Sequence, residues 1–203
     1  MMSKKLIYFL LTGIILLVFT NNGKSQAMYV GVTAGMAQIN FRSQNAGDII
    51  SANPGYDLGF YIKTGHRLFY QAGLNWTNSQ IQIKYNQPGV IDAENITSHN
   101  FKLPLKIGYR LLQKPMFKWN ILAGPFIGKT LFKSANNIPV KKSDFLNPQY
   151  GLVAGTGIRL TNFIFDVEYA YYVSQLFKNP ASGSFPLSEA RLDMITLKVG
   201  VQF

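Results

Sequence analysis

The sequence predicts an all-β protein, an eight-stranded antiparallel transmembrane β-barrel that is preceded by a cleaved signal peptide. Three features support this prediction. Apolar and polar residues alternate in many stretches, the connections between these stretches alternate in length, and the N-terminus is first basic and then apolar. An alternation with a period of two indicates a β-strand whose two faces meet different environments.

The N-terminal segment has the composition of a secretory signal peptide. Two lysines precede an apolar run at residues 6–19, and Ser25 and Ala27 supply the small residues of a cleavage site. The run is short for a membrane-spanning helix. We therefore expect residues 1–27 to be removed and residues 28–203 to form one barrel domain. An uncleaved membrane anchor is the alternative.

The overall composition limits the classes of function. Charged residues make up 14% of the 203 residues, whereas about a quarter is usual in soluble domains. The net charge of +11 comes from lysines and arginines that are spread along the chain, with no run longer than Lys141-Lys142, so we expect no nucleic-acid partner. The absence of cysteine excludes disulfides, thiolate metal sites and a lipid-modified cysteine. With only His66 and His99 as histidines, we expect no metal or other cofactor.

The C-terminal stretch Arg191 to Phe203 shows the alternation most clearly. One face carries Ile195, Leu197, Val199, Val201 and Phe203, and the other carries Thr196, Lys198, Gly200 and Gln202. In a soluble sandwich the lysine would face water and the apolar row would face a core. In a membrane barrel the apolar row faces lipid, the lysine faces the lumen and the terminal aromatic residue lies at the interface. This strand alone leaves both alternatives open.

The number and the connections of the strands favour the barrel. The expected strands are residues 29–41, 55–63, 67–77 (with an extension through 83 as an alternative), 98–111, 117–131, 150–160, 163–174 and 191–203. Their first, third, fifth and seventh connections are long, and the other three contain only a few residues. Bacterial outer-membrane barrels have an even number of strands of about ten residues, with short periplasmic turns and long outer loops. A sandwich gives no reason for connections to alternate in length.

The polar faces of these strands carry charged residues, which must contact water or an oppositely charged partner inside the barrel. The cations on the predicted inner side are Lys63, Lys102, Lys106, Arg110, Lys118, Arg159 and Lys198, and the acids are Asp57, Asp166 and Glu168. Glycines recur on the same side, as an eight-stranded barrel requires, because its interior is just wide enough to be filled by side chains.

Two prolines fit poorly into this scheme. Pro104 and Pro125 fall at nearly the same height on neighbouring predicted strands. Proline removes a hydrogen-bond donor from the ladder, and a closed barrel has no free edge that would tolerate the loss. We therefore expect a shared bulge or a local opening of the sheet at these two residues.

The acidic residues Asp166 and Glu168 are the first candidate site. They lie two residues apart and therefore on one face of a strand, and the short turn places Arg159 and Lys198 at a similar depth. We expect structural ion pairs in the lumen. The alternative is acid–base catalysis by the two carboxyl groups, which would need a substrate cleft that a filled lumen lacks.

A basic loop is the second candidate site. Lys133, Lys141 and Lys142 fall in a polar connection on the expected outer side. Surface lysines attract anionic head groups, so these residues are candidate contacts for the phosphates of the outer leaflet. A loop that only contacts water is the alternative.

The whole chain after residue 27 resembles the outer-membrane β-barrel proteins of the Bacteroidota, a family sometimes called PorT-like. The resemblance rests on the first strand at residues 29–35, on the Leu-Pro-Leu segment within residues 103–109, and on the terminal residues 198–203. It implies a barrel in the bacterial outer membrane, and some members of the family take part in protein secretion and gliding. It also implies that the terminal phenylalanine is a signal for the barrel-insertion machinery.

Three functions follow as hypotheses. The first is a non-enzymatic outer-membrane protein with a structural, adhesive or secretion-associated role, whose partners are outer-membrane lipids and proteins that bind its outer loops. The second is a pore for small solutes. The third is an enzyme of the outer leaflet that uses Asp92, Ser98 and His99 at the rim, because some eight-stranded outer-membrane barrels are acyltransferases with such residues. We expect no catalytic site, since a histidine at a strand end is more often simply solvated.

Overall fold

The computed structural model describes residues 28–42, 49–84, 93–133, 148–174 and 191–203, and these form one antiparallel sheet of nine strands. The predicted signal peptide, residues 1–27, lies outside the described residues and stays a prediction. The strands are β1 (Met28–Arg42), β2 (Ile49–Ala52), β3 (Gly55–Gly65), β4 (Leu68–Lys84), β5 (Ala93–Gln113), β6 (Phe117–Lys133), β7 (Gln149–Leu160), β8 (Phe163–Tyr172) and β9 (Arg191–Gln202).

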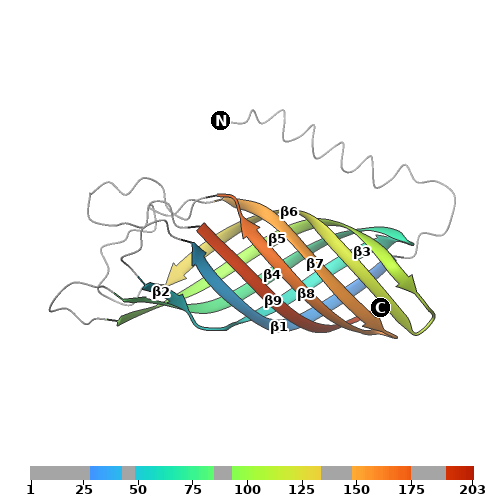
Figure 1. The fold of residues 1–203 in the computed structure, drawn as a ribbon, viewed down its shortest axis with the longest axis horizontal. Coiled ribbons are helices and arrows are strands. Elements are labelled where there is room, and N and C mark those ends of the chain that lie inside the picture. The colour runs from blue at the N-terminus through green and yellow to red at the C-terminus, as the bar shows by residue number, and fades with distance from the viewer. Residues whose placement is uncertain (1–27, 43–48, 85–92, 134–147, 175–190) are drawn as a thin grey trace, which may run out of the picture.

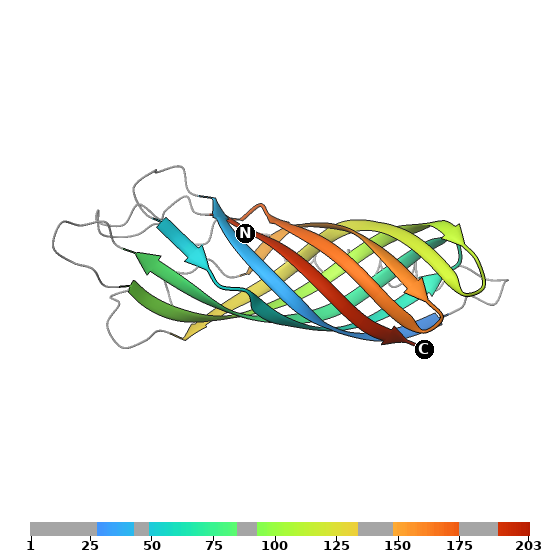
Figure 2. The ribbon, with the colours of Figure 1, turned by 60° about the horizontal axis from the view of Figure 1, so that its bottom comes forward.

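The sheet closes on itself and forms a barrel. The neighbours follow the order β2-β4-β3-β1-β9-β8-β7-β6-β5, and pairing between β4 and β5 joins the two sides. The first and last strands pair over a long antiparallel register that runs from Gly31 opposite Gln202 to Arg42 opposite Arg191. The long strands cross the barrel at a steep tilt (Figures 1 and 2). The predicted eight-stranded antiparallel barrel is confirmed, since β2 is a short addition to eight long strands.

Strand β2 lies in a segment that the sequence predicts as a loop. It pairs with residues 81–84 of β4, directly beyond the part of β4 that pairs with β3. β2 and β3 therefore lie end to end along the same side of β4, and Asn53 and Pro54 separate them. Asn53 still donates its backbone N–H to the carbonyl of Gln80, whereas Pro54 has no N–H to donate. No alternating pattern marks such a short strand, so the sequence gives no sign of it.

The two ends of the barrel differ. At one end, which we call the turn end, short connections join β3 to β4, β5 to β6 and β7 to β8. Positive φ angles at Gly65 (115°) and Thr161 (55°) form two of these tight turns. At the other end, the loop end, lie the strand ends that border residues 43–48, 85–92, 134–147 and 175–190 (Figure 1). This sorting of connections agrees with the pattern predicted from the sequence.

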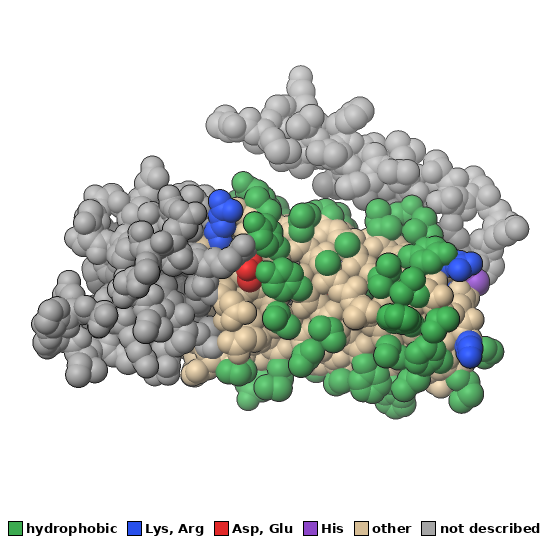
Figure 3. All heavy atoms as spheres, viewed as in Figure 1, with side chains coloured by type: hydrophobic (Ala, Val, Ile, Leu, Met, Phe, Trp, Pro, Cys, Tyr) green, Lys and Arg blue, Asp and Glu red, His purple; other side chains and the backbone are tan. Residues whose placement is uncertain are grey.

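Outward-facing residues of the long strands are apolar and exposed. Leu197 is 57% exposed, whereas Lys198 beside it in β9 is 5% exposed, so the alternation of the last strand places its apolar row outside and its lysine inside. Hydrophobic side chains are spread over the visible wall of the barrel, and the charged side chains on this face lie near its two ends (Figure 3). No helix in the described ranges has the length and apolar character needed to span a membrane.

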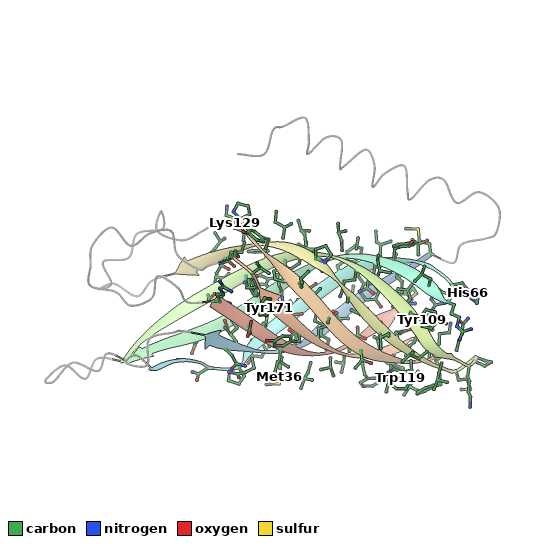
Figure 4. The ribbon with its side chains drawn as sticks, turned by 45° about the horizontal axis from the view of Figure 1, so that its top comes forward. Met36, His66, Tyr109, Trp119, Lys129 and Tyr171 are labelled. Atoms are coloured by element: carbon green, nitrogen blue, oxygen red, sulfur yellow. The ribbon has the colours of Figure 1, made fainter. Side chains whose placement is uncertain are left out.

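Aromatic residues lie near both ends of this apolar wall. Tyr109 and Trp119 lie toward the turn end, and Tyr171 lies toward the loop end (Figure 4). The indole N–H of Trp119 donates to the hydroxyl of Thr156 at 2.8 Å, which satisfies its polar group on an otherwise apolar surface. Aromatic residues at both boundaries of an apolar band are typical of membrane barrels.

Pro104 interrupts the ladder between β4 and β5. Pairing is present at Ala72 opposite Leu105 and again at Asn75 opposite Lys102, but Pro104 and the residue before it are unpaired on this side. The register is the same on both sides of the gap, so the sheet opens here without a bulge. The buried proline faces the lumen opposite Gly73, which leaves room for its ring.

Pro125 interrupts the ladder between β5 and β6 in the same way. The pairs Pro104 opposite Phe126 and Ile107 opposite Ala123 flank a gap, and Pro125 remains paired with Leu152 of β7. Both gaps therefore border β5 at one height, which confirms the predicted local opening. The predicted bulge is wrong for this position. The register shift of β5 lies closer to the turn end, between Arg110 and Leu112.

Candidate functional site

The lumen contains a network of buried ion pairs at mid-height. Glu168 of β8 accepts from Lys198 of β9 at 3.0 Å and from Lys106 of β5, which reaches it across the lumen. Lys198 also lies 3.4 Å from a carboxylate oxygen of Asp57 in β3. All four side chains are buried. Four strands that are not all neighbours are therefore joined through the lumen.

Polar neighbours stabilise the charge of Asp57 further. Asn75 donates to one carboxylate oxygen at 3.2 Å, and Thr77 donates to the other at 2.7 Å. Both donors lie on β4, the neighbour of β3. A buried carboxylate needs such hydrogen bonds because burial removes its water. The hydrogen bonds from β4 therefore hold Asp57, and with it the ion-pair network, in a defined position.

The structure brings together some of the four residues that the sequence nominates for ion pairs. Glu168 and Lys198 are in contact, but Arg159 does not contact either acid. Arg159 donates its Nε to the carbonyl of Thr161 at 2.6 Å and lies at the turn end. Asp166 forms no ion pair with any described residue, although it lies in the lumen and is buried. Lys106 and Asp57 lie on the predicted inner face, but the alternation of their strands does not indicate that they belong to this network.

The space left in this part of the lumen is very small. A cavity of about 10 Å³ lies among the ion pairs, bordered by Lys106, Asp166, Glu168, Lys198 and polar residues of β1, β3 and β4. That is roughly the minimum volume in which one water molecule fits. The cavity is polar, so a single water there would find partners. It offers no room for a sugar or a comparable substrate beside the two acids.

Large side chains fill the lumen toward the loop end. Tyr172 is 1% exposed, and its ring meets the ring of Phe126 edge-on with centroids 4.8 Å apart. Asn100 donates to the hydroxyl of Tyr172 at 2.8 Å and to Thr130 at 3.0 Å. Met194 is fully buried in the same part of the lumen. The lumen is thus a packed core with a polar centre.

The rim residues that the sequence suggests as catalytic candidates do not converge. Ser98 is buried inside the barrel, whereas His99 points to the other face of β5 and stacks on Trp76 with ring centroids 6.0 Å apart. Asp92 lies outside the described residues. Because adjacent residues of a strand point to opposite faces, Ser98 and His99 cannot act on one substrate. Within the described ranges, no three histidine or acidic residues lie close enough together to hold a metal ion.

The basic loop cannot be placed. Lys141 and Lys142 lie outside the described residues. Lys133 is the last residue of β6, and its side chain is likewise not described. Contacts of these lysines with lipid phosphates therefore stay a prediction.

A closed antiparallel sheet with an apolar exterior, aromatic boundaries and a charged, filled interior defines a transmembrane β-barrel of a bacterial outer membrane. The chain belongs to the family of the outer membrane protein beta-barrel domain, whose sequence profile matches residues 22–178. This places the protein in the bacterial outer membrane. The turn end of such a barrel faces the periplasm, and the loop end faces outward.

Solved structures agree with this fold. OprG from Pseudomonas aeruginosa superposes with a TM-score of 0.53 at 11% identity, covering 88% of this chain and 97% of OprG. Neisserial surface protein A superposes with a TM-score of 0.51 at 14% identity, covering 89% of this chain and 100% of that protein. At these identities the likeness concerns the fold. No curated protein sequence matches the chain significantly.

Proposed function

We propose that the protein is a non-enzymatic outer-membrane component that acts through its outer connections, in a structural, adhesive or secretion-associated role. The observation that carries this proposal is the filled lumen. The cavity among the ion pairs holds about one water molecule, and Tyr172, Phe126 and Met194 occupy the space between it and the loop end. A barrel with so little interior space favours binding at its ends over transport through its centre.

The rival function is a pore for small solutes, and conductance separates the two. The purified protein is reconstituted in planar lipid bilayers, and its folded state is verified on a gel without heating. We expect no steady channels. Steady large channels from the folded protein would refute the proposed function and favour the pore.

A partner-directed experiment complements the conductance measurement. The tagged protein is purified from gently solubilised outer membranes, and its partners are identified by mass spectrometry. The resemblance to PorT-like proteins of the Bacteroidota favours secretion components among them. A matched control replaces residues 175–190 by a short glycine-serine linker, and we expect this variant to lose the specific partners while keeping the folded barrel. Identical partners with and without this connection would count against a role for it.

The third hypothesis, a lipid-modifying enzyme at the rim, is disfavoured by the opposite orientations of Ser98 and His99. We propose that His99 packs on Trp76 and takes no part in catalysis. Outer-membrane lipid from a strain with His99→Ala should therefore have the same mass spectrum as lipid from the parent strain. A missing lipid modification in that strain would support the enzyme.

We also propose the barrel-insertion machinery as a partner during biogenesis. Phe203 is 73% exposed at the turn end, and its backbone N–H donates to the carbonyl of Val30 at 2.8 Å. These features support a terminal aromatic side chain that is held in place and accessible to another protein. Deletion of Phe203 should slow assembly of the barrel in cells, as judged by accumulation of unfolded protein in the periplasm.

A further inference from the structure

Cationic side chains from three strands surround one aromatic ring at the periplasmic end of the lumen. Arg110 of β5, Lys118 of β6 and Arg159 of β7 lie with their charged ends 5.7, 5.9 and 5.0 Å from the centre of the Tyr29 ring. Tyr29 points inward from β1 and is half-buried. Such cation–π contacts are favourable, but they leave the positive charges without an anion.

A fourth cation lies in the same layer. Lys63 pairs with Tyr29 in the register of β1 and β3. It is 6% exposed, and its ammonium group lies 4.5 Å from the centre of the Phe69 ring and 5.4 Å from that of Tyr61. Arg110 also approaches Phe69, at 5.7 Å. Aromatic rings therefore hold two buried cations where carboxylates would be expected.

This group, which we call the Tyr29 cluster (Tyr29, Lys63, Arg110, Lys118 and Arg159), contains no acidic side chain. None of its four cations forms an ion pair with a described residue. Asp166 is the acid that acts electrostatically on Lys63, and it lies farther from the turn end, beside the ion-pair network. The C-terminal residue Phe203 accepts from the N–H of Val30 and also forms no ion pair. The neighbouring turns add Arg67 and Lys114 and contain no acid.

Two buried donors at this end have no acceptor. The Nη1 of Arg159 is inaccessible to water and unpaired, while its Nε donates to the carbonyl of Thr161. One layer above Tyr29, the Nε2 of Gln202 is also unpaired, although its Oε1 accepts from the hydroxyl of Tyr61 at 3.0 Å. Buried donors without a partner are uncommon in folded proteins and call for an acceptor. An anion in contact with Arg159 would offset part of the positive charge and would accept a hydrogen bond from its Nη1.

We propose that the Tyr29 cluster is a binding site for a phosphate group that enters from the periplasmic side. Two guanidinium groups provide planar pairs of donors that match phosphate oxygens, and two ammonium groups add charge at flexible positions. The phosphate comes either from a small free anion or from the head group of a phospholipid in the inner leaflet. This site lies at the opposite end of the barrel from the outer connections, so it does not depend on the function proposed for them.

Nuclear magnetic resonance of the side-chain N–H groups of arginine tests this site. The full barrel is reconstituted in nanodiscs of phosphatidylcholine and titrated with inorganic pyrophosphate at constant ionic strength. In a second arm, phosphatidylglycerol replaces a fraction of the phosphatidylcholine. The test variants are Arg159→Gln and Lys118→Gln. The matched control is Lys129→Gln, an exposed lysine of β6 at the opposite end of the barrel (Figure 4). The unheated gel verifies folding of every variant.

A bound phosphate should shift the Nε–H resonance of Arg159 or of Arg110 in a saturable manner. Saturation by pyrophosphate identifies a free anion as the source, and a shift only with phosphatidylglycerol identifies a head group. Either result supports the site if Lys118→Gln weakens the apparent affinity roughly tenfold, as expected for one lost charge-assisted hydrogen bond, and Lys129→Gln leaves it unchanged. The proposal is overturned if neither probe shifts these resonances, or if Lys118→Gln and Lys129→Gln have the same effect.

Discussion

Lys106 of β5 and Glu168 of β8 form an ion pair across the lumen, although β6 and β7 separate their strands in the sheet. Backbone hydrogen bonds hold neighbouring strands together, but they do not join strands on opposite walls. The ion pair of Lys106 with Glu168, together with Lys198 and Asp57, joins strands that are not neighbours in the sheet. We infer that this network helps to determine the cross-section of the barrel.

Replacement of Glu168 tests this inference on stability. Glu168→Gln leaves Lys106 without its ion-pair partner and Lys198 with Asp57 alone. Loss of one partner from a buried ion pair costs about 3–5 kcal/mol. We expect a decrease of that size in the free energy of unfolding, measured by urea titration in lipid vesicles with tryptophan fluorescence. Asp166→Asn is the control, because Asp166 lies two residues away on the same face without an ion pair. Equal losses in both variants would contradict the role of the network.

Reversal of charge at Lys198 should affect folding more strongly. Lys198→Glu places a third buried negative charge beside Asp57 and Glu168, where a cation now compensates both. Like charges at such short range repel strongly when water is excluded. We expect the variant to lose the compact band that a folded barrel gives on a gel without heating. Lys129→Glu, on the exposed face of β6, should keep this band. An unchanged band for Lys198→Glu would show that the lumen tolerates the charge.

The fold could be predicted from the sequence because it depends on local patterns. The alternation in residues 191–203 identifies a strand with one apolar face, and the sorting of the connections identifies a barrel. The prolines likewise revealed where the ladder opens, since the missing N–H is a property of the residue itself. Strand β2 was missed because four residues next to Pro54 show no pattern.

The ion pairs were harder to predict, and their register shows why. Asp166 lies directly opposite Lys198 between β8 and β9, yet the ammonium group of Lys198 contacts Glu168 and Asp57. A long side chain in a narrow lumen reaches several acids, so the opposite residue in the ladder need not be its partner. Pairs across the lumen, such as Lys106 with Glu168, depend on the stagger and the tilt of the strands. Neither quantity follows from the pattern of one strand.

Close packing inside the barrel gives another prediction. A methyl group at Gly108 of β5 would fall within the ring of Phe69 on β4. Overpacking of this kind costs about 1–3 kcal/mol. We expect Gly108→Ala to lower the free energy of unfolding by that amount and Phe69→Leu in the same chain to restore part of it. Gly73→Ala is a comparison with a milder contact, since its methyl group would lie 3.0 Å from the carbonyl oxygen of Phe60, whereas the methyl group at Gly108 would overlap the Phe69 ring, so we expect a smaller loss there. Failure of Phe69→Leu to restore stability would show that the clash is relieved elsewhere.

The openings beside β5 should be visible in hydrogen exchange. Pairing between β4 and β5 is missing at Gly73 and Leu74, and pairing between β5 and β6 is missing at Leu105 and Lys106. These four residues keep their pairing on the other side, with β3 or with β4, but a ladder that is open on one side needs only small local motions to expose an amide. We therefore expect them to exchange faster than Ala72 and Asn75, which are paired on both sides. Pro104→Ala restores an N–H on the β4 side and should slow exchange there, while the gap beside Pro125 stays unchanged. Uniform protection along β4 and β5 would show that the ladder is continuous despite the two prolines.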